Sequence, residues 1–439
     1  MTDARAAALR VLTACRRSGA WADAALAATL SSAQLSPADA ALCSRIVYGV
    51  MQNRLLLDYR LSAFCTQKPE RLQPPLADIL RIGAYQILFM DRIPVSAAVN
   101  ESVRLAKENG RTAASGLVNA VLRRLDREKN SLPPLPEDET ERLSVAYSHP
   151  RWLVERFIDL LGREEAEKLL RADNEIAPLT VQVNPLKTTP RALREELRSC
   201  GIEAEEDGTV EGALILRGTG ELTRLKAFAE GRFTVQDTAA HMVALAAAYR
   251  GNTRVLDVCA APGGKTFDAA FAMENTGEIV ACDLHENKLK RIRDGAKRLG
   301  LTSIKTLAAD GRVFIPEWEE SFDTVLCDVP CSGLGVIRKK PDIRYKDKES
   351  LSALPAIQSE ILDNSCRYVR PGGVLLYSTC TLLPEENERQ IEDFLVRHKD
   401  FTAEEFTLPS GEKGAAVTLW QHRGTHDGFF ISKLRKQNG

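Results

Sequence analysis

The chain has 439 residues, of which 44% are hydrophobic and 27% are charged, and its formal net charge is −1. This length predicts two to four domains, because a domain typically has ~100–200 residues, and no apolar run approaches the ~20 residues that span a membrane. The ten cysteines are irregularly spaced and no secretory signal is seen, which argues against a disulfide framework and favours a cytoplasmic protein. The histidines are scattered and no cysteine pair has metal-ligand spacing, so no metal site is predicted.

Residues 1–130 are predicted to form an all-α domain of five to seven helices, because apolar residues recur there at the spacing of amphipathic helices. The segment carries 18 Lys and Arg against 11 Asp and Glu, a net charge of +7. This charge favours a polyanionic partner, although a solvated helical surface would explain it equally well. The expected helices are Ala4–Cys15, Ala22–Thr29, Ala38–Arg54, Leu76–Met90, Val95–Glu108 and Ala113–Arg127.

Residues 131–235 are predicted to form a linker and a small α+β domain. The linker is "SLPPLPEDETE", residues 131–141, which combines three prolines with an acidic run. Beyond it, short helical and strand-like segments follow one another without a strong repeat. The expected helices are Trp152–Leu161, Arg163–Leu170 and Arg191–Cys200, and the expected strands include Leu179–Val183 and Ala213–Arg217.

Residues 236–439 alternate between apolar, β-rich runs and helical stretches such as Lys288–Leu299 and Ser359–Tyr368. This alternation predicts an α/β Rossmann-like domain, a doubly wound sheet of parallel strands. Ligands of such sheets bind outside the carboxyl ends of the strands. The five expected strands are Arg254–Cys259, Glu278–Cys282, Ser303–Ala309, Phe322–Cys327 and Gly373–Thr379.

A glycine-rich turn and three acids follow the first four of these strands. The turn lies in "LDVCAAPGGKT", residues 256–266, and matches neither a dinucleotide fingerprint nor a P-loop. The acids are Asp283, Asp310 and Asp328. One such acid alone is more often a helix cap or a turn residue. Three together beside a glycine turn favour a ligand with ribose hydroxyls, an amine and a cationic sulfonium, as in an adenosyl compound.

Two cysteines follow the fourth and fifth strands, at Cys331 and Cys380. Because these two strands are neighbours in the usual strand order of the fold, we expect both thiols to face one cleft. Most cysteines in proteins are buried and inert. That interpretation suits four others, which are Cys259, Cys282, Cys327 and Cys366.

Several motifs resemble those of the RNA cytosine-C5 methyltransferases, which have a class I methyltransferase domain. They are "DVCAAPGGKT", "CDVPCSGLGVIRKKPDIRY", "QSEILDNS", "YSTCTLLPEENE" and "DGFFISKL". The helical start, with "RIGAYQILFMDRIPVSAAVNESVRLAK" and "GLVNAVLRR", is similar to the NusB-type RNA-binding domain. The combination is typical of the Sun/Fmu type, which methylates a cytosine of 16S ribosomal RNA.

The resemblance implies S-adenosyl-L-methionine as the methyl donor, with no metal. It implies that Cys380 attacks C6 of the cytosine and that Cys331 assists product release. Addition of a thiolate at C6 also requires a hydrogen bond or proton at N3 of the base, for which Asp328 is the candidate. The implied cofactor-binding residues are Cys259, Ala260, Ala261, Pro262, Gly263, Gly264, Lys265, Asp283, Asp310 and Asp328. The expected partner is 16S ribosomal RNA, naked or in an early assembly intermediate, and the protein is expected to act as a monomer.

Basic residues after Cys331 are candidates for phosphate contacts with RNA. They are Arg338, Lys339, Lys340, Arg344 and Lys346, of which Lys339 and Lys340 fit a solvated loop equally well. The sequence also departs from the usual family motifs at two positions, where Val329 replaces an alanine and Gln182 replaces an arginine. The second departure bears on RNA contact by the strand at 179–183.

Three alternatives remain open. The same chemistry can act on a transfer RNA or on another ribosomal cytosine. An amino-group methyltransferase is disfavoured, because those enzymes typically carry Asn/Asp-Pro-Pro-aromatic where this chain has Asp-Val-Pro-Cys. A non-catalytic RNA-binding assembly factor is also disfavoured, because both cysteines and all three acids are present.

Overall fold

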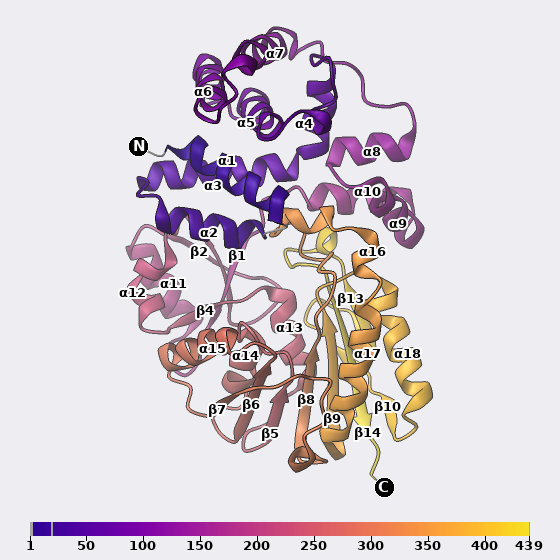
Figure 1. The fold of residues 1–439 in the computed structure, drawn as a ribbon. Coiled ribbons are helices and arrows are strands. Elements are labelled where there is room, and N and C mark those ends of the chain that lie inside the picture. The colour runs from indigo at the N-terminus through magenta and orange to yellow at the C-terminus, as the bar shows by residue number, and fades with distance from the viewer. Residues whose placement is uncertain (1–2, 19–20, 439) are drawn as a thin grey trace. The chain divides into compact units, whose positions relative to one another are not determined.

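In the computed structural model, which describes residues 3–18 and 21–438, the chain divides into two compact units (Figure 1). The helical unit is the described part of Met1–Glu175 together with Ile337–Lys346. The sheet unit is Ile176–Val336 together with the described part of Asp347–Gly439. The chain therefore leaves the sheet unit once, after Val336, and returns to it at Asp347. The domain boundaries predicted at residues 130 and 235 stay a prediction.

The first part of the helical unit is all-α, as predicted. Each expected helix is present, and a further short helix, α4, follows α3 directly. The central helix is α5, in which every residue from Leu76 to Ile87 is buried, as is typical of a helix surrounded by other helices. The helices are α1 (Ala4–Ser18), α2 (Ala22–Ser32), α3 (Pro37–Gln52), α4 (Arg54–Ser62), α5 (Leu76–Phe89), α6 (Val95–Glu108) and α7 (Ser115–Glu128).

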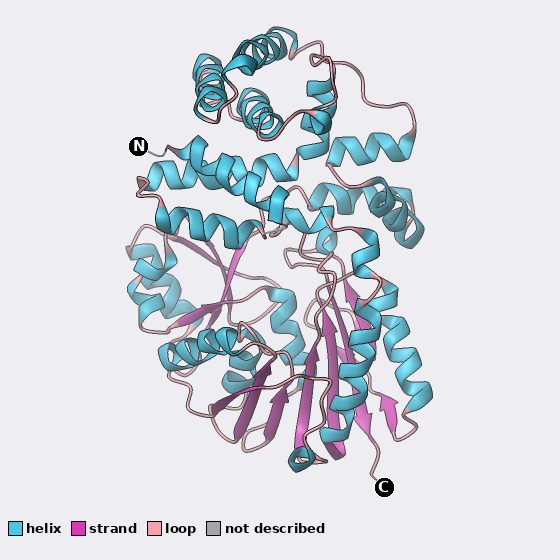
Figure 2. Cartoon of the chain, in the orientation of Figure 1, coloured by secondary structure: helices cyan, strands magenta, loops and turns pink. Residues whose placement is uncertain are grey.

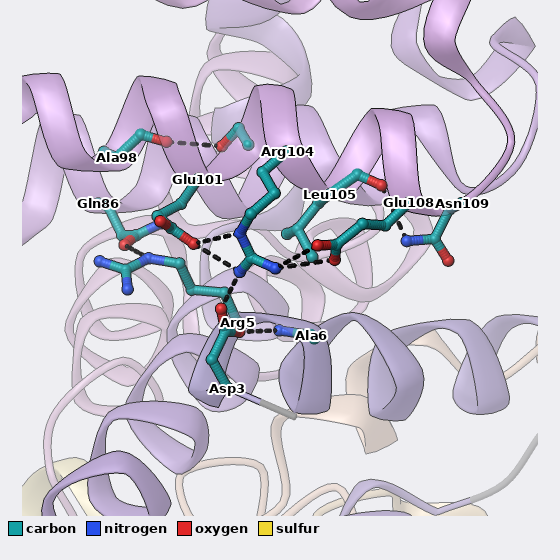
Figure 3. A network of polar contacts seen from close by, with 11 residues as sticks. Asp3, Arg5, Ala6, Gln86, Ala98, Glu101, Arg104, Leu105, Glu108 and Asn109 are labelled. Atoms are coloured by element: carbon teal, nitrogen blue, oxygen red, sulfur yellow. Dashed lines mark hydrogen bonds and ion pairs between the residues drawn. The ribbon is translucent and has the colours of Figure 1, made fainter. Parts of the chain in front are cut away.

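A network of polar contacts joins the start of α1 to α6 (Figure 3). Its centre is Arg104, whose guanidinium donates to Glu101 at 2.6 Å and to Glu108 at 2.7 Å, and also pairs with Asp3. Three carboxylates thus surround one arginine. This part of the basic segment is therefore neutralised within the fold and does not add to the charge available to a polyanion.

Three more helices complete this part of the chain: α8 (Glu139–Tyr147), α9 (Arg151–Leu161) and α10 (Arg163–Ala172). The acidic end of the predicted linker forms the start of α8. Asp138 is its N-cap and accepts a hydrogen bond from the Glu141 amide at 2.8 Å, and Glu139 and Glu141 lie in the first turn. Acids at this end of a helix are stabilised by its free amides.

Ile337–Lys346 is held inside the helical unit by Arg344, which lies in a 3-10 turn (Pro341–Tyr345). The Arg344 side chain is fully buried and donates at 2.7 Å to Asn174. It also donates at 3.1 Å to the carbonyls of Tyr147 and Asp173. The interpretation of Arg344 as a phosphate ligand is therefore wrong, because the group is out of contact with solvent and its two terminal nitrogens donate to oxygens of the protein.

The sheet unit begins with a small antiparallel sheet of order β2-β3-β1-β4, which confirms the small α+β fold. The helices α11 (Pro190–Ser199) and α12 (Lys226–Ala229) pack on it, and Phe233 and Val181 lie in its core. Gln182 is buried within this sheet. Its strands are β1 (Leu179–Val183), β2 (Glu203–Glu206), β3 (Ala213–Arg217) and β4 (Phe233–Val235).

The large sheet has the order β10-β14-β9-β8-β5-β6-β7, with β13 paired to β14. The five predicted strands are β5 (Arg254–Asp257), β6 (Glu278–Asp283), β7 (Ile304–Ala308), β8 (Phe322–Asp328) and β9 (Val369–Thr379), and they pair in parallel. A further strand, β14 (Phe429–Lys436), continues the sheet beyond these five and runs antiparallel to β9. The strands β10 (Phe401–Ala403) and β13 (Ala416–Leu419) pair antiparallel with β14.

Helices cover both faces of the large sheet (Figure 2). Successive residues of β5 belong to opposite cores: Leu256 packs with α17 and α18, and Val255 packs with α14 and α15. This alternation follows from the two-residue period of a strand. The helices are α13 (Thr238–Ala247), α14 (Gly264–Ala272), α15 (Glu286–Leu299), α17 (Leu354–Ser365) and α18 (Glu388–Arg397). Among the described residues, none of these or the other helices has the length and apolar character of a membrane span.

Candidate active site

Four acids lie along one edge of the large sheet. Asp257, Asp283 and Asp328 are the last residues of β5, β6 and β8, and Asp310 follows the end of β7 by two residues. These strands are parallel neighbours, so their carboxyl ends share an edge. The structure thus brings together the three acids predicted from the sequence and adds Asp257, which the sequence reading left out.

A cavity of about 250 Å³ opens at this edge, within the sheet unit. Its lining includes most of the predicted cofactor residues: Cys259, Ala260, Ala261, Pro262, Gly264, Lys265 and Asp328. It also includes residues that sequence reasoning missed, among them Asp257, Gln236, Phe228 and Arg298. Phe228 and Arg298 stack on one another, with the guanidinium carbon 3.9 Å from the ring centroid. Pairs of this kind depend on tertiary contacts and have no local sequence signal.

The glycine-rich turn brings the backbone close to this cavity. Gly263 has a φ of +112°, a conformation that residues with a Cβ rarely adopt. A Cβ on Gly264 would lie 2.0 Å from Gln236 Oε1, so only glycine fits there. Gln236 is held in place by a hydrogen bond from its Nε2 to Asp268 at 3.1 Å. The turn therefore leads directly into α14, whose first two residues, Gly264 and Lys265, line the cavity.

Lys265 and Asp328 form an ion pair in the cavity, with 2.7 Å between Nζ and Oδ2. The other oxygen of Asp328 accepts a hydrogen bond from the Ser378 hydroxyl at 2.9 Å. Lys265 also lies 4.8 Å from the centroid of the Phe429 ring, on β14. Burial lowers the pKa of Lys265, but the Asp328 carboxylate outweighs this effect and raises it overall. Lys265 is therefore a buried ammonium group at neutral pH.

Asp257 is fully enclosed, and its Oδ2 accepts a hydrogen bond from Thr266 at 2.7 Å. Burial is the main reason that the pKa of Asp257 rises to about 7, with a further contribution from the Asp328 carboxylate. Such a carboxyl group is poised to respond to a nearby positive charge.

Asp283 and Asp310 are tied to their own loops and do not line the cavity of about 250 Å³. Asp283 Oδ1 accepts from the His285 amide at 3.0 Å and lies 3.3 Å from Lys288 Nζ. Asp310 pairs with Arg312 at 2.7 Å, and this hydrogen bond lowers the pKa of Asp310. Asp310 lines a second, smaller cavity of about 10 Å³ together with Val258, Trp318 and Tyr368.

The sulfur atoms of Cys331 and Cys380 lie 3.3 Å apart. The prediction that the two thiols face one another is therefore confirmed by this distance. The hydrogen bond to Cys380, together with burial, holds the pKa of Cys331 well above its ordinary value. Either sulfur can donate in this S–H contact. The four cysteines expected to be inert include Cys282 and Cys327, whose pKa values burial raises to about 12.

Comparison with known proteins matches three parts of the chain to known families. Residues 243–435 match the family described as 16S rRNA methyltransferase RsmB/F. Residues 2–127 match the NusB family, and residues 149–223 match the ferredoxin-like domain of RsmF/B-like methyltransferases. The sequence-based resemblance and the three types of domain are therefore confirmed.

Relatives match over nearly the full length. The chain is 37% identical to the probable ribosomal RNA small subunit methyltransferase B of Bacillus subtilis, over 99% of each chain. It is 34% identical to ribosomal RNA small subunit methyltransferase B of Vibrio cholerae, over 92% of this chain and 91% of that protein. The crystal structure of PH0851 is 29% identical, with a TM-score of 0.82 over 98% of each chain. The chain belongs to the RsmB/F family of 16S rRNA methyltransferases.

Proposed function

We propose that the protein transfers a methyl group from S-adenosylmethionine to C5 of a cytosine in 16S ribosomal RNA, through a covalent bond from Cys380 to C6 of the base. The observation that carries this proposal is the 3.3 Å approach of two thiols beside an acid-lined cavity. Methylation of an amine or a hydroxyl needs no thiol, whereas methylation at C5 needs a nucleophile at C6, and a second thiol beside it can assist its release.

The residues that line the cavity suit S-adenosylmethionine in their chemistry. Asp257 and Asp328 offer carboxylates to a cationic sulfonium, and the glycine turn admits a ligand close to its backbone. Asp283 lies at the end of β6, where a doubly wound fold places the acid that accepts bonds from ribose hydroxyls. We assign Cys259–Lys265, Asp283, Asp310 and Asp328 to cofactor binding. When bound there, the cofactor supplies the methyl group as an electrophile.

Residues of the protein carry out the other steps of the reaction. The Cys380 thiolate forms a bond to C6, and the electron pair of the C5–C6 double bond becomes available at C5. Asp328 faces the base edge at N3, and Lys265, which pairs with it, passes a proton through this carboxyl group to N3 during addition. The proton returns to Lys265 by the same route when the C6–S bond breaks. After methyl transfer, a base takes the C5 proton, the C5–C6 double bond re-forms and the C6–S bond breaks. Cys331, which lies against the leaving sulfur, assists this last step.

A groove in the helical unit supports an RNA substrate. It has a volume of about 1120 Å³ and is lined by Arg10, Arg16, Arg17 and Arg111, beside apolar residues of α1. Arg16 also pairs with Asp78 at 3.0 Å. Four guanidinium groups around one groove suit the phosphate oxygens of a nucleic acid.

The test is incubation of the protein with labelled S-adenosylmethionine and naked 16S RNA, followed by mapping of the methylated cytosines. We expect 5-methylcytosine at one position. Transfer RNA in a parallel reaction separates the main alternative, because label in transfer RNA alone would move the proposal to that substrate. Absence of 5-methylcytosine from both RNAs, under conditions that methylate a control RNA, would overturn the proposal.

A further inference from the structure

One buried carboxylate lies beneath both cysteine loops. Glu386 is at the end of a 3-10 turn (Pro384–Glu386), six residues after Cys380, and only 2% of the residue is exposed. Its position in "TLLPEENE" gives no indication of burial, because acidic residues surround it there. A buried carboxylate requires hydrogen bonds that replace its hydration, so its partners indicate its task.

The partners of Glu386 are the residues that directly follow the two cysteines. Its Oε2 accepts a hydrogen bond from the backbone amide of Ser332, next to Cys331, at 2.9 Å. Its Oε1 accepts from the hydroxyl of Thr381, next to Cys380, at 3.3 Å. Ser332 and Thr381 are joined directly, with their hydroxyl oxygens 2.5 Å apart. One side chain thus holds the two loops at matching positions.

A second side chain supports the same carboxylate from α17. Gln358 is fully buried, and its Nε2 donates to Glu386 Oε2 at 2.8 Å and to the Pro330 carbonyl at 2.9 Å. The residues on both sides of Cys331 are therefore fixed, Pro330 through Gln358 and Ser332 through Glu386. On the other side, the Tyr377 hydroxyl donates to the Glu386 carbonyl at 2.6 Å, which ties the turn to β9.

We infer that Glu386 is a positioning residue that sets the separation of the two thiols. It does not touch either sulfur atom in the contacts described above, so it acts through Ser332 and Thr381. A carboxylate suits this task because it accepts several bonds and donates none, whereas the backbone amide and both side-chain partners all donate. The inference rests on the proposed roles of Cys331 and Cys380 for its catalytic consequence, but its structural consequence is measurable without them.

The test uses the rate at which Cys331 and Cys380 join in a disulfide. Diamide removes two electrons and two protons from a pair of thiols, and peptide mass spectrometry identifies the linked pair. This rate depends on the distance and alignment of the sulfur atoms and needs neither RNA nor S-adenosylmethionine. Full-length wild type, Glu386→Gln and Glu386→Ala are compared, with Glu392→Gln as a matched control on the exposed side of α18.

We expect Glu386→Gln and Glu386→Ala to form the Cys331–Cys380 link about tenfold more slowly than the wild type, because misalignment of reacting atoms by ~1 Å is costly. Glu392→Gln should match the wild type. Methyl transfer by both Glu386 variants should fall in kcat by ~100-fold. Binding of S-adenosylmethionine, measured by calorimetry, should stay within about twofold of the wild type, since Glu386 is absent from the cavity lining.

An unchanged rate of linkage in folded Glu386→Gln would overturn the inference, even if its melting temperature fell. If Glu386→Ala does not fold, the disulfide rate of Glu386→Gln still tests the carboxylate, and that of Thr381→Val tests the hydroxyl that donates to it. If the Glu386 variants form the Cys331–Cys380 disulfide slowly but the wild type methylates no RNA, the positioning role of Glu386 stands and only the proposed function fails. The two failures are therefore distinguishable.

Discussion

The sulfur atoms of Cys331 and Cys380 lie 3.3 Å apart although 49 residues separate them in the chain. Each thiol follows a strand, and β8 and β9 are parallel neighbours with Cys327 opposite Tyr377. The contact is therefore a consequence of sheet pairing. The hydrogen bond to Cys380, together with burial, raises the pKa of Cys331 well above its ordinary value.

The two cysteines should give opposite phenotypes when each is replaced. Cys380→Ala should lower methyl transfer by ~10³-fold or more, because it removes the nucleophile, and should trap no RNA. Cys331→Ala should accumulate an RNA–protein adduct that survives denaturing gel electrophoresis, because addition proceeds and elimination stalls. Exchanged phenotypes would reverse the assigned roles. Cys200→Ala is a suitable control, since this cysteine is exposed and belongs to the small antiparallel sheet region.

Substitutions of Lys265 and Asp328 should have non-additive effects on the free energy of unfolding. The two side chains are only 12% and 28% exposed, so Asp328→Asn leaves a largely buried ammonium group without its counterion. We expect a loss of about 3 kcal/mol in the free energy of unfolding. Lys265→Met combined with Asp328→Asn should lose at least about 1 kcal/mol less than the sum of the two single variants. Urea unfolding of the four proteins measures this coupling, and additive losses would contradict it.

Binding of S-adenosylmethionine should strengthen as pH rises through 7. The pKa of Asp257 is raised to about 7, so the carboxyl group is neutral below this pH and negatively charged above it. The charged form attracts a sulfonium cation. S-adenosylhomocysteine, whose sulfur is uncharged, should respond much less. Calorimetry from pH 6 to pH 8 should show the ratio of the two affinities change by about tenfold in the wild type. A similar change in Asp257→Asn would show that another group is responsible.

Arg344 should be essential for the stability of the helical unit. Arg344→Met keeps much of the side-chain volume but leaves Asn174 Oδ1 and the carbonyl of Asp173 without this donor. Because each buried acceptor left without a partner costs about 1–3 kcal/mol, we expect a loss of at least about 2 kcal/mol. Urea unfolding and limited proteolysis of α8–α10 check this expectation. Lys340→Met, at an exposed position of the same segment, should change stability by no more than ~0.5 kcal/mol.

His149 should make the protein less stable in mild acid. Burial, reinforced by the charge of Arg344, lowers the pKa of His149 from 6.5 to about 4. Between pH 6.5 and pH 4, His149 is therefore protonated in the unfolded chain but neutral in the native state. Its contribution to the free energy of unfolding falls as the pH decreases through this range. The loss should reach about 3 kcal/mol, at ~1.4 kcal/mol for each pKa unit. His149→Gln should lack this component when unfolding is compared between pH 7 and pH 4.5, and an unchanged pH dependence would contradict the assignment.

Local pattern was sufficient for much of the fold. Apolar residues at helical spacing predicted α1, α5 and α6 closely, because amphipathic helices carry their period in a few consecutive turns. The predicted strand at Leu179–Val183 has the observed bounds. The short helix α4 and the strand β14 were missed as elements, because nine residues show little period and β14 is defined by its pairing with β9, β10 and β13. The burial of Arg344 was missed because an arginine in a basic run has the composition of a solvated loop.

The sequence by itself determined the chemistry available to this protein: two thiols after neighbouring strands, a glycine turn and acids at strand ends. These features are local, because each functional residue follows its predicted strand within a few positions of the sequence. Only the tertiary structure decided which groups meet. Asp257 in the cavity, Lys265 against Asp328, and Glu386 beneath both cysteine loops depend on contacts between residues 9 to 63 positions apart. Burial then gives these contacts their strength, because a charge removed from water depends on the partner that replaces its hydration.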